Sequence, residues 1–370
     1  LEEKTNNNIL EQQQLLKITM TKRPSSGDDG QLALYKRTKS GTQSLEVTEM
    51  QQDEDAPKRF SSLKEPLMLL TGHEAGILTC KFHPHGDTLA SAGHDRSIFL
   101  WKVHDDCKNY ATLKNAHANS ITDLVYSSDG SRLFSCSADK TVIIWDNQTG
   151  VRIKKLKEHY AIVNALSVPI EDPNLLASVG DDNQIIIWDV RKRKYAFLHE
   201  DNYPLTSVAF TKNGHSVVCG GIENVLKVWD LRKDAMIYGM RGHTDTVTGL
   251  ALSPDGNYVL SNSMDRTLKV WDVRPFAPDN RLLTSYVGHQ HSFEKNLLRC
   301  NWSCDGKMVS AGSSDRSVYI WDTRSCQILY KLPGHQGSVN EVVFHPSEPI
   351  VLSCSSDKQL YMGEIEPLSH

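Results

Sequence analysis

The chain has 370 residues, of which 39% are hydrophobic and 23% are charged, and its formal net charge is −4 at pH 7. Such a near-neutral balance argues against a broad electrostatic attraction to nucleic acids or membranes. No apolar run approaches the roughly 18 residues of a membrane span, and no signal peptide with a cleavage site is visible near the start. We therefore expect neither a membrane protein nor a secreted one.

The first 60 residues differ in composition from the rest of the chain. They are polar, rich in Gln, Asn and Ser, and they mix short basic pairs with an acidic run. Because they lack the apolar periodicity that would bury one face, we expect residues 1–60 to form a disordered N-terminal tail. Two basic pairs, Lys22-Arg23 and Lys36-Arg37, suggest part of a nuclear import signal, although solvated charges in a tail explain them equally well.

One stretch is then repeated to the end of the chain. Its clearest copy, residues 242–272, opens with Gly-His and closes with Trp-Asp: GHTDTVTGLALSPDGNYVLSNSMDRTLKVWD. Copies follow one another at 42 to 46 residues, a period typical of the four-stranded blades of a β-propeller. The His position holds His73, His117, His159, Asp201, His243, His289 and His335, and the Trp position holds Trp101, Trp145, Trp188, Trp229, Trp271, Trp321 and Gly363.

Three strands are predicted within the copy quoted above, at residues 247–252, 258–261 and 267–271. Their β-branched and aromatic content favours strands over helices, and Ser-Pro-Asp-Gly at 253–256 fits a tight turn. An apolar run before the next Gly-His supplies a fourth, outer strand. The sequence therefore predicts an all-β fold with almost no helix, a seven-bladed β-propeller over residues 61–366.

The last copy has no apolar run after it that could form its own outer strand. An apolar run, Leu67 to Leu70, instead precedes the first Gly-His, where no earlier blade exists. We predict that residues 64–71 form the outer strand of the last blade and close the ring. Closure covers two sheet edges that would otherwise expose unpaired backbone groups.

Four types of side chain recur together in the copies. The His imidazole can lie between an Asp carboxylate and a Ser hydroxyl, and the Ser can accept the indole N–H of the Trp. We predict that this network pins the loop before each blade to the turn between its two middle strands. It is complete in copies one, two, three and five, which contain His73, Ser91, Asp95 and Trp101; His117, Ser135, Asp139 and Trp145; His159, Ser178, Asp182 and Trp188; and His243, Ser261, Asp265 and Trp271.

The other three copies depart from this pattern. Copy six has Ala311 in place of Ser, and copy seven has Gly363 in place of Trp. Copy four has Asp201, Cys219 and Glu223, so two acids would face each other, and we expect no network there.

Recurrence of the His and Asp residues in blade after blade indicates a structural rather than a catalytic role. The chain also lacks G-x-S-x-G, H-E-x-x-H and the Gly-rich phosphate-binding motifs. The HPH and HQH segments at 83–85 and 289–291 have no third ligand at motif spacing, and Cys300 and Cys304 have no matching second pair. We expect no enzyme activity, no cofactor and no metal site, and we interpret these histidines as loop residues.

The Gly-His and Trp-Asp units resemble those of the WD40-repeat family over about residues 60–366. That family consists of seven-bladed platforms for interactions. The segments VWDVRPFAP (270–278), HSFEKNLLRCNWSCDG (291–306), YKLPGHQGSVNEVVFHPSEPI (330–350) and SSDKQLYMGEI (355–365) are similar to the WD-repeat subunits of the U5 small nuclear ribonucleoprotein of the splicing machinery. The resemblance implies a nuclear, non-catalytic scaffold that contacts the large scaffold protein and the RNA helicase of that particle. It also implies RNA association through the complex and a monomer outside it.

Two insertions mark a candidate partner surface. The connection before copy six is lengthened and contains Arg274 and Phe276, and the loop after its Gly-His is lengthened within 290–296, which includes Phe293, Glu294 and Lys295. We expect these loops on opposite faces of the ring, where binding residues often occur on a rigid scaffold. Neutral variation in loop length is the alternative, and Phe293 could equally pack onto the neighbouring blade.

A substrate receptor of a cullin-type ubiquitin ligase is the second function considered. Trp-Asp-x-Arg occurs in four successive copies and resembles the adaptor-docking motif of such receptors, although it is widespread in WD repeats; the arginines are Arg191, Arg232, Arg274 and Arg324. A propeller hydrolase has no supporting motif.

Overall fold

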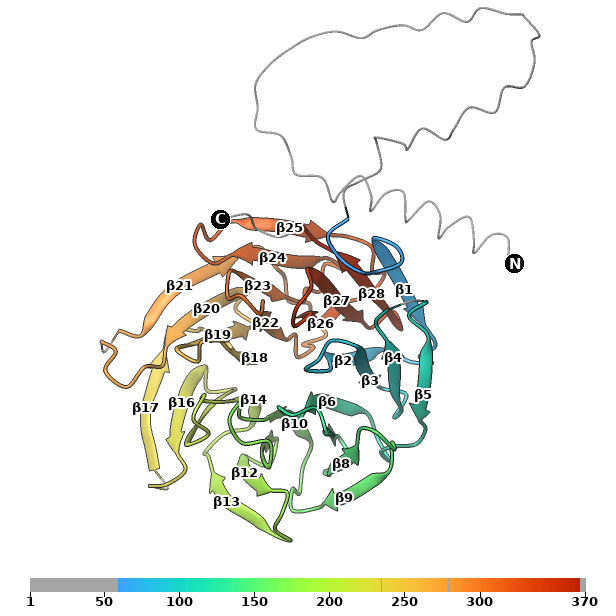
Figure 1. Cartoon of the computed structure of the whole chain (residues 1–370). Helices are drawn as coiled ribbons and strands as arrows, with labels where there is room; N and C mark the ends of the chain where they lie inside the picture. The colour runs from blue at the N-terminus through green and yellow to red at the C-terminus, as the bar shows by residue number, and fades with distance from the viewer. Residues whose placement is uncertain (1–58, 105, 234, 279, 367–370) are drawn as a thin grey trace, which may run out of the picture.

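The computed structural model describes residues 59–104, 106–233, 235–278 and 280–366. These residues form 28 strands and no helix, arranged as seven four-stranded sheets around a central axis (Figure 1). The predicted all-β, seven-bladed propeller is confirmed. No helix long and apolar enough to cross a membrane occurs in this part of the chain. The expected N-terminal tail, with Lys22-Arg23 and Lys36-Arg37, lies outside the described residues except for its last two.

Each blade is an antiparallel sheet whose first strand faces the axis and whose fourth forms the rim. Blades one to three contain β2 Ile77–Phe82, β3 Thr88–Gly93, β4 Ile98–Lys102 and β5 Asn109–Leu113; β6 Ile121–Tyr126, β7 Arg132–Ser137, β8 Val142–Asp146 and β9 Arg152–Leu156; β10 Val163–Ser167, β11 Leu175–Gly180, β12 Gln184–Asp189 and β13 Tyr195–Glu200. Blades four and five contain β14 Leu205–Phe210, β15 Ser216–Gly221, β16 Val225–Asp230 and β17 Ala235–Arg241; β18 Val247–Leu252, β19 Tyr258–Ser263, β20 Thr267–Asp272 and β21 Leu282–Val287. Blades six and seven contain β22 Cys300–Trp302, β23 Met308–Ala311, β24 Val318–Asp322 and β25 Ile328–Leu332; β26 Val339–Phe344, β27 Ile350–Ser355, β28 Gln359–Glu364 and β1 Leu67–Thr71.

Strand β1 is the outer strand of blade seven, where the two ends of the described chain meet (Figure 1). It runs antiparallel to β28, from Leu67 opposite Gly363 to Thr71 opposite Gln359. The residues before β1 add to this seam, since Arg59 Nε lies 2.9 Å from a carboxylate oxygen of Glu364. The ring is thus closed by backbone pairing between segments nearly 300 residues apart in sequence.

The core is divided into seven apolar layers, each between two consecutive blades. Between blades four and five, for example, Val218 and Leu226 pack with Val259 and Trp271. Because side chains alternate along a strand, each sheet contributes one set of apolar side chains to the layer on either side. Burial of this apolar surface, at about 25 cal/mol per Å², is what holds the blades together.

The turn between the two middle strands has the same backbone conformation in all seven blades. The residue after the conserved acid has a positive φ of 62° to 72°, and these residues are Arg96, Lys140, Asn183, Asn224, Arg266, Arg316 and Lys358. In blade five this conformation lets Oδ1 of Asp265 accept the N–H of Thr267 at 2.9 Å. The Asp side chain therefore shapes its own turn, as Asp commonly does.

Candidate functional site

The structure brings the four side chains of the predicted network together in blades one, two, three and five. In blade five, Nδ1 of His243 lies 2.8 Å from Asp265, and Nε2 lies 2.6 Å from Oγ of Ser261. Nε1 of Trp271 donates to the same Oγ at 2.8 Å. Equivalent contacts join His73, Ser91, Asp95 and Trp101; His117, Ser135, Asp139 and Trp145; and His159, Ser178, Asp182 and Trp188.

In each network the Ser hydroxyl contacts the His ring and the His ring contacts the Asp carboxylate, as in a Ser-His-Asp catalytic triad. Ser261 is fully buried, and its hydroxyl oxygen already accepts the indole N–H, so no substrate carbonyl can reach it. Burial alone would raise the pKa of Asp265, but hydrogen bonds from His243, Thr267 and the backbone N–H of Thr244 outweigh burial and hold this pKa below its usual range. The arrangement stabilises a buried carboxylate rather than activating a nucleophile.

Blade four lacks the His-Ser-Asp-Trp network, as expected, but its two acids are linked in another way. Nζ of Lys227 lies 2.6 Å from Asp201 and also pairs with Glu223, so one cation neutralises the two acids that would otherwise repel each other. Cys219 replaces the Ser, and Nε1 of Trp229 has no hydrogen-bond partner among the described residues. The blade keeps an electrostatic link between its entry loop and its turn, but with a different donor.

Blade six also has a different network from the one its sequence suggests. His289 turns away from its own acid, and its Nε2 lies 2.8 Å from Oδ1 of Asn262 in blade five. The hydroxyl of Tyr319 instead donates to Asp315 at 2.6 Å. Tyr319 and Lys227 both stand two residues before the Trp, and a donor side chain at that position is the sequence signal that could have identified them.

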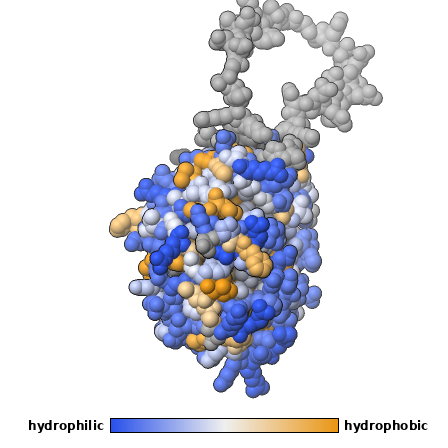
Figure 2. Space-filling model, turned by 90° about the vertical axis from the view of Figure 1, so that its left-hand side faces the viewer, coloured by the Kyte–Doolittle hydropathy of each residue, from blue (hydrophilic) through white to orange (hydrophobic). Residues whose placement is uncertain are grey.

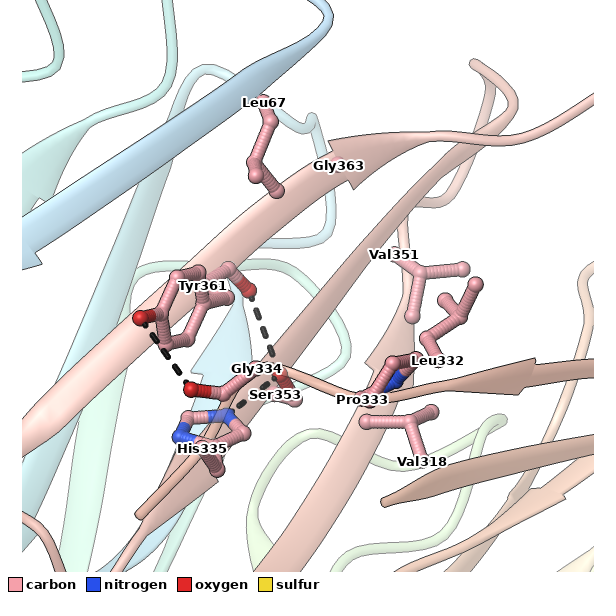
Figure 3. A pocket seen from close by; sticks show the side chains of 10 residues that line it. All are labelled: Leu67, Val318, Leu332, Pro333, Gly334, His335, Val351, Ser353, Tyr361 and Gly363. Carbon is pink, nitrogen blue, oxygen red and sulfur yellow. Dashed lines mark hydrogen bonds between the residues drawn. The ribbon is translucent and has the colours of Figure 1, made fainter. Parts of the chain in front are cut away.

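Blade seven retains the His and Ser contacts but has Gly363 in the Trp position. Nδ1 of His335 lies 2.9 Å from Asp357, and Nε2 lies 2.9 Å from Oγ of Ser353. Without the indole, a small cavity of about 30 Å³ remains beside Ser353, lined chiefly by apolar side chains from β1, β24, β25 and β27 (Figure 3). This volume exceeds the ~10–15 Å³ that one water needs but is far below the ~150 Å³ of a cavity that binds benzene.

The residues of the candidate partner surface lie in two separate places. Arg274 and Phe276 belong to the loop between β20 and β21, whereas Phe293, Glu294 and Lys295 precede β22. Because β21 crosses the blade between these loops, they lie on opposite faces of the ring. Phe276 and Phe293 are fully exposed, so Phe293 does not pack onto the neighbouring blade.

The Arg274 guanidinium is held by its own blade rather than free. Nη2 lies 2.5 Å from Oδ2 of Asp272, and Cζ lies 5.6 Å from the centre of the Tyr258 ring. Arg191 is paired in the same way with Asp189 at 2.8 Å. These pairs hold the aspartates of the Trp-Asp motif and stiffen the loops that follow them.

Apolar side chains on the rim are scattered. Seen from the side of blades four and five, small apolar patches are separated by polar side chains (Figure 2). Exposed apolar residues of the outer strands there include Met236 and Ile237 of β17 and Leu283 and Val287 of β21. The rim on this side therefore offers no broad apolar surface, and the two loops with exposed Phe side chains are the more prominent features.

A buried charged cluster near the axis was not predicted from the sequence. Arg299 of blade six reaches across to blades two and three, where Nη2 donates to the carbonyl oxygen of Asn164 at 2.8 Å and Nη1 lies 3.3 Å from Asp123. Lys81 pairs with Glu341 beside it. Burial raises the pKa of Asp123 despite the attraction of Arg299 and Lys81. A single charged residue beside an apolar strand does not form a recognisable sequence motif. The sequence therefore gives no indication of these contacts across the ring.

Among the described residues, one group has the composition of a metal site: His104, His345 and Glu348. Nε2 of His345 donates to the carbonyl oxygen of Gly86 at 3.0 Å, and its Nδ1 accepts the N–H of Glu348 at 3.0 Å. With both ring nitrogens engaged, His345 has no lone pair left for an ion, so the group does not fit a metal. Cys300 and Cys304 are unpaired thiols.

Residues 289–291 lie in the loop between β21 and β22, as expected, but the two histidines are not free in solvent. His289 is buried, and burial with the neighbouring His291 lowers its pKa to about 3. Burial also lowers the pKa of His291 to about 4, and neither of its ring nitrogens has a hydrogen-bond partner in the described structure. His289 contacts Asn262 of blade five, and His291 lies near enough to Asp245 and Asp265 of that blade for their charges to act on it.

Comparison with known proteins identifies the class to which this fold belongs. The WD domain, G-beta repeat family matches seven segments, one per blade: residues 64–102, 107–146, 150–189, 192–230, 235–272, 276–322 and 326–362. The chain belongs to the WD40-repeat family.

Within that family, the chain is similar to proteins of the splicing machinery. It is 55% identical over 310 residues to the U5 small nuclear ribonucleoprotein 40 kDa protein of Bos taurus, covering 84% of this chain and 86% of that one. The protein of the same name from Dictyostelium discoideum is 46% identical over 311 residues, covering 84% and 87%. Pre-mRNA-splicing factor cwf17 of Schizosaccharomyces pombe is 43% identical over 308 residues, covering 83% and 90%. The chain is a splicing-related WD-repeat protein of the same family.

Proposed function

We propose that the chain is a nuclear, non-catalytic scaffold of the U5 small nuclear ribonucleoprotein. The observation that carries this proposal is its identity of 46–55% with proteins of that name, over more than four fifths of both chains. The buried state of the Ser-His-Asp sets supports a non-catalytic role, because their hydroxyls are closed to substrates. The partners are protein subunits of the particle, among them its large scaffold protein and its RNA helicase, and RNA associates through them.

The candidate partner surface consists of the two loops with exposed Phe side chains. An aromatic ring that is fully exposed on a supported loop has the character of an interface anchor. Phe276 follows Arg274, which is fixed on Asp272, so its loop is held at the base. Phe293 lies in a turn closed by Lys295 N–H donating to the carbonyl oxygen of Ser292 at 3.2 Å. The two loops serve two partners, because they lie on opposite faces.

Affinity purification of the tagged chain from nuclear extract tests the proposal. The expected result is recovery of U5 snRNA and the large proteins of the particle. Recovery of a cullin and its adaptor instead would establish the ubiquitin-ligase alternative, which no contact in the structure favours.

Phe276→Ala and Phe293→Ala should each lose partners while keeping the melting temperature, and Ile237→Ala on the rim is the matched control. Full recovery with both variants would remove these residues from the interface.

A further inference from the structure

Six cations gather on the rim of blades two and three. Arg191, Lys192, Arg193 and Lys194 form the exposed connection between β12 and β13. Nζ of Lys154, on β9 of the neighbouring blade, donates to the carbonyl oxygen of Lys192 and so ties the two blades together here. Arg152 lies two residues before Lys154 on the same strand, across a β-bulge. We call the set Arg152, Lys154, Arg191, Lys192, Arg193 and Lys194 the basic rim.

Little negative charge compensates the basic rim. Asp189 is the acid paired with it, at 2.8 Å from Nε of Arg191 and 3.9 Å from Nζ of Lys192. Within the described part of the chain, Arg193 and Lys194 form no ion pair, and neither does Lys154. The matching loop of blade four is different, because it has two cations, Arg232 and Lys233, close to the carboxylate of Asp230.

Two aromatic rings continue from the cations along the outer strand of blade three. Tyr195 and Phe197 are each 39% exposed on β13, directly after Lys194. A β-bulge lies between them, because Tyr195 is opposite Trp188 and Phe197 is opposite Ile187 on β12, so the two rings do not follow the regular alternation of a strand. Cations followed by exposed aromatic rings are the combination with which proteins hold single-stranded nucleic acid: the cations neutralise phosphates and the rings stack on bases.

We propose that the basic rim, with Tyr195 and Phe197, binds single-stranded RNA. This goes beyond the proposed protein scaffold, since it assigns the chain a direct RNA contact. The net charge of −4 does not oppose it, because at physiological salt the field of a distant charge is screened over about 8 Å. A strand lying along blade three would place its phosphates on Lys192, Arg193 and Lys194 and its bases on the two rings. Release of counterions from the phosphates supplies the affinity.

The shape of the loop favours RNA over a receptor that reads an extended basic peptide. Lys192 N–H donates to the carbonyl oxygen of Asp189 at 2.9 Å, and Arg191 is fixed by two contacts to the Asp189 carboxylate. The four exposed cations are therefore held in a turn rather than in an extended segment. An acidic protein segment is the remaining competitor for the cations. Its carboxylates would not stack on the exposed rings, whereas nucleobases would.

Fluorescence anisotropy with the purified full chain and a short labelled oligouridylate tests the proposal. For the wild type, the logarithm of the association constant should fall linearly with the logarithm of the salt concentration. The variant Lys192→Glu/Arg193→Glu/Lys194→Glu should bind at least tenfold more weakly and lower the salt slope by about 2, as expected for three lost contacts to single-stranded phosphates. Arg191 is left unchanged because it holds the loop. Tyr195→Ala/Phe197→Ala should weaken binding several-fold without changing the slope.

The matched control is Arg232→Glu/Lys233→Glu, which reverses charges in the equivalent loop of blade four. It should bind RNA like the wild type, and melting temperatures should show that all variants are folded. No binding at low salt, or equal losses in the two charge-reversal variants, would overturn the proposal. Tighter binding of a polyglutamate peptide than of RNA would also overturn it and assign the rim to an acidic protein. Because no particle protein is present, the result is independent of the scaffold proposal.

Discussion

Ser261 and Ser353 occupy the same position in blades five and seven but have different partners. Ser261 contacts His243 and accepts the N–H of Trp271, whereas Ser353 contacts His335 and has a small cavity where the indole would lie. The pair therefore separates the contribution of the His contact from that of the indole contact within one chain.

Ser261→Ala should destabilise the protein more than Ser353→Ala. The first substitution leaves two buried polar groups without a partner and the second leaves one, and each such group costs about 1–3 kcal/mol. We expect the free energies of unfolding from urea titration to differ by about 1–2 kcal/mol. Equal losses would mean that the indole N–H contributes nothing measurable to the network.

The two buried histidines of blade six predict a pH dependence of stability. Their folded-state pKa values, about 3 for His289 and about 4 for His291, lie below the ordinary value of 6.5. Below pH 6.5 the unfolded chain therefore binds protons at these two histidines that the folded chain does not. The contribution of the neutral histidines to stability is fully present above pH 6.5 and is lost as the pH falls toward 4.

His291→Leu should reduce this acid sensitivity. Neither ring nitrogen of His291 has a hydrogen-bond partner in the described structure, so an apolar side chain loses no such contact. Between about pH 7 and pH 5 the wild type should lose about 2 kcal/mol more than the variant, at 1.36 kcal/mol per pKa unit. Thermal melts at both pH values measure the difference. A variant as acid-sensitive as the wild type would show that His291 is already protonated in the folded state.

At the scale of elements, the ring is closed by one short strand. β1 pairs with β28 along its whole length, and Leu70 and the preceding Leu63 are buried in the apolar layer between blades seven and one. Without β1, β28 would become an exposed edge with unpaired backbone groups, which invites aggregation. The seam therefore makes the fold of the whole ring depend on residues 59–71.

Two truncations test this dependence. Deletion of residues 1–58 should leave the melting temperature nearly unchanged, because the contacts of Arg59 and of β1 remain. Deletion through Thr71 should destabilise the propeller or cause aggregation. Differential scanning calorimetry, with light scattering for the second protein, distinguishes the two. The closure would be refuted by equal melting temperatures.

The seam also shows how far the sequence alone can lead. The outer strand at 64–71 follows from counting apolar runs, and the fold follows from seven copies in one register, because both are periodic signals. The donors Lys227 and Tyr319 were not predicted because a donor at their repeat position does not always reach the acid. Lys269 and Tyr361 occupy the same position in other blades but contact Ser285 and the carbonyl oxygen of Gly334 instead. The run from Arg191 to Lys194 is visible in the sequence, but its proximity to Lys154 is not, because that contact joins two blades. Contacts that depend on one side chain reaching another blade leave no period in the sequence.

At the scale of the whole molecule, three surfaces point in different directions. Phe276 and Phe293 lie on opposite faces of the ring, and the basic rim lies on its circumference at blades two and three. A propeller is rigid because every blade packs on two neighbours, so partners held at these places would keep a fixed geometry relative to one another. That rigidity requires the centre of the ring to resist distortion. Arg299 spans this centre and connects blade six to blades two and three.

Arg299→Met should lower the free energy of unfolding by about 3–5 kcal/mol, since it leaves the buried carboxylate of Asp123 without its cation. The carbonyl oxygens of Thr122 and Asn164 would lose their donor as well. Adding Asp123→Asn should restore part of the loss, because an amide removes the unpaired charge and its oxygen still accepts the N–H of Leu166, now 2.8 Å from the carboxylate. A urea-melt double-mutant cycle measures this coupling. Hydrogen exchange in the single variant should rise first in β6 and β10, the inner strands that Arg299 joins to blade six. Additive losses, with exchange unchanged in those strands, would show that the centre is held by the blades alone.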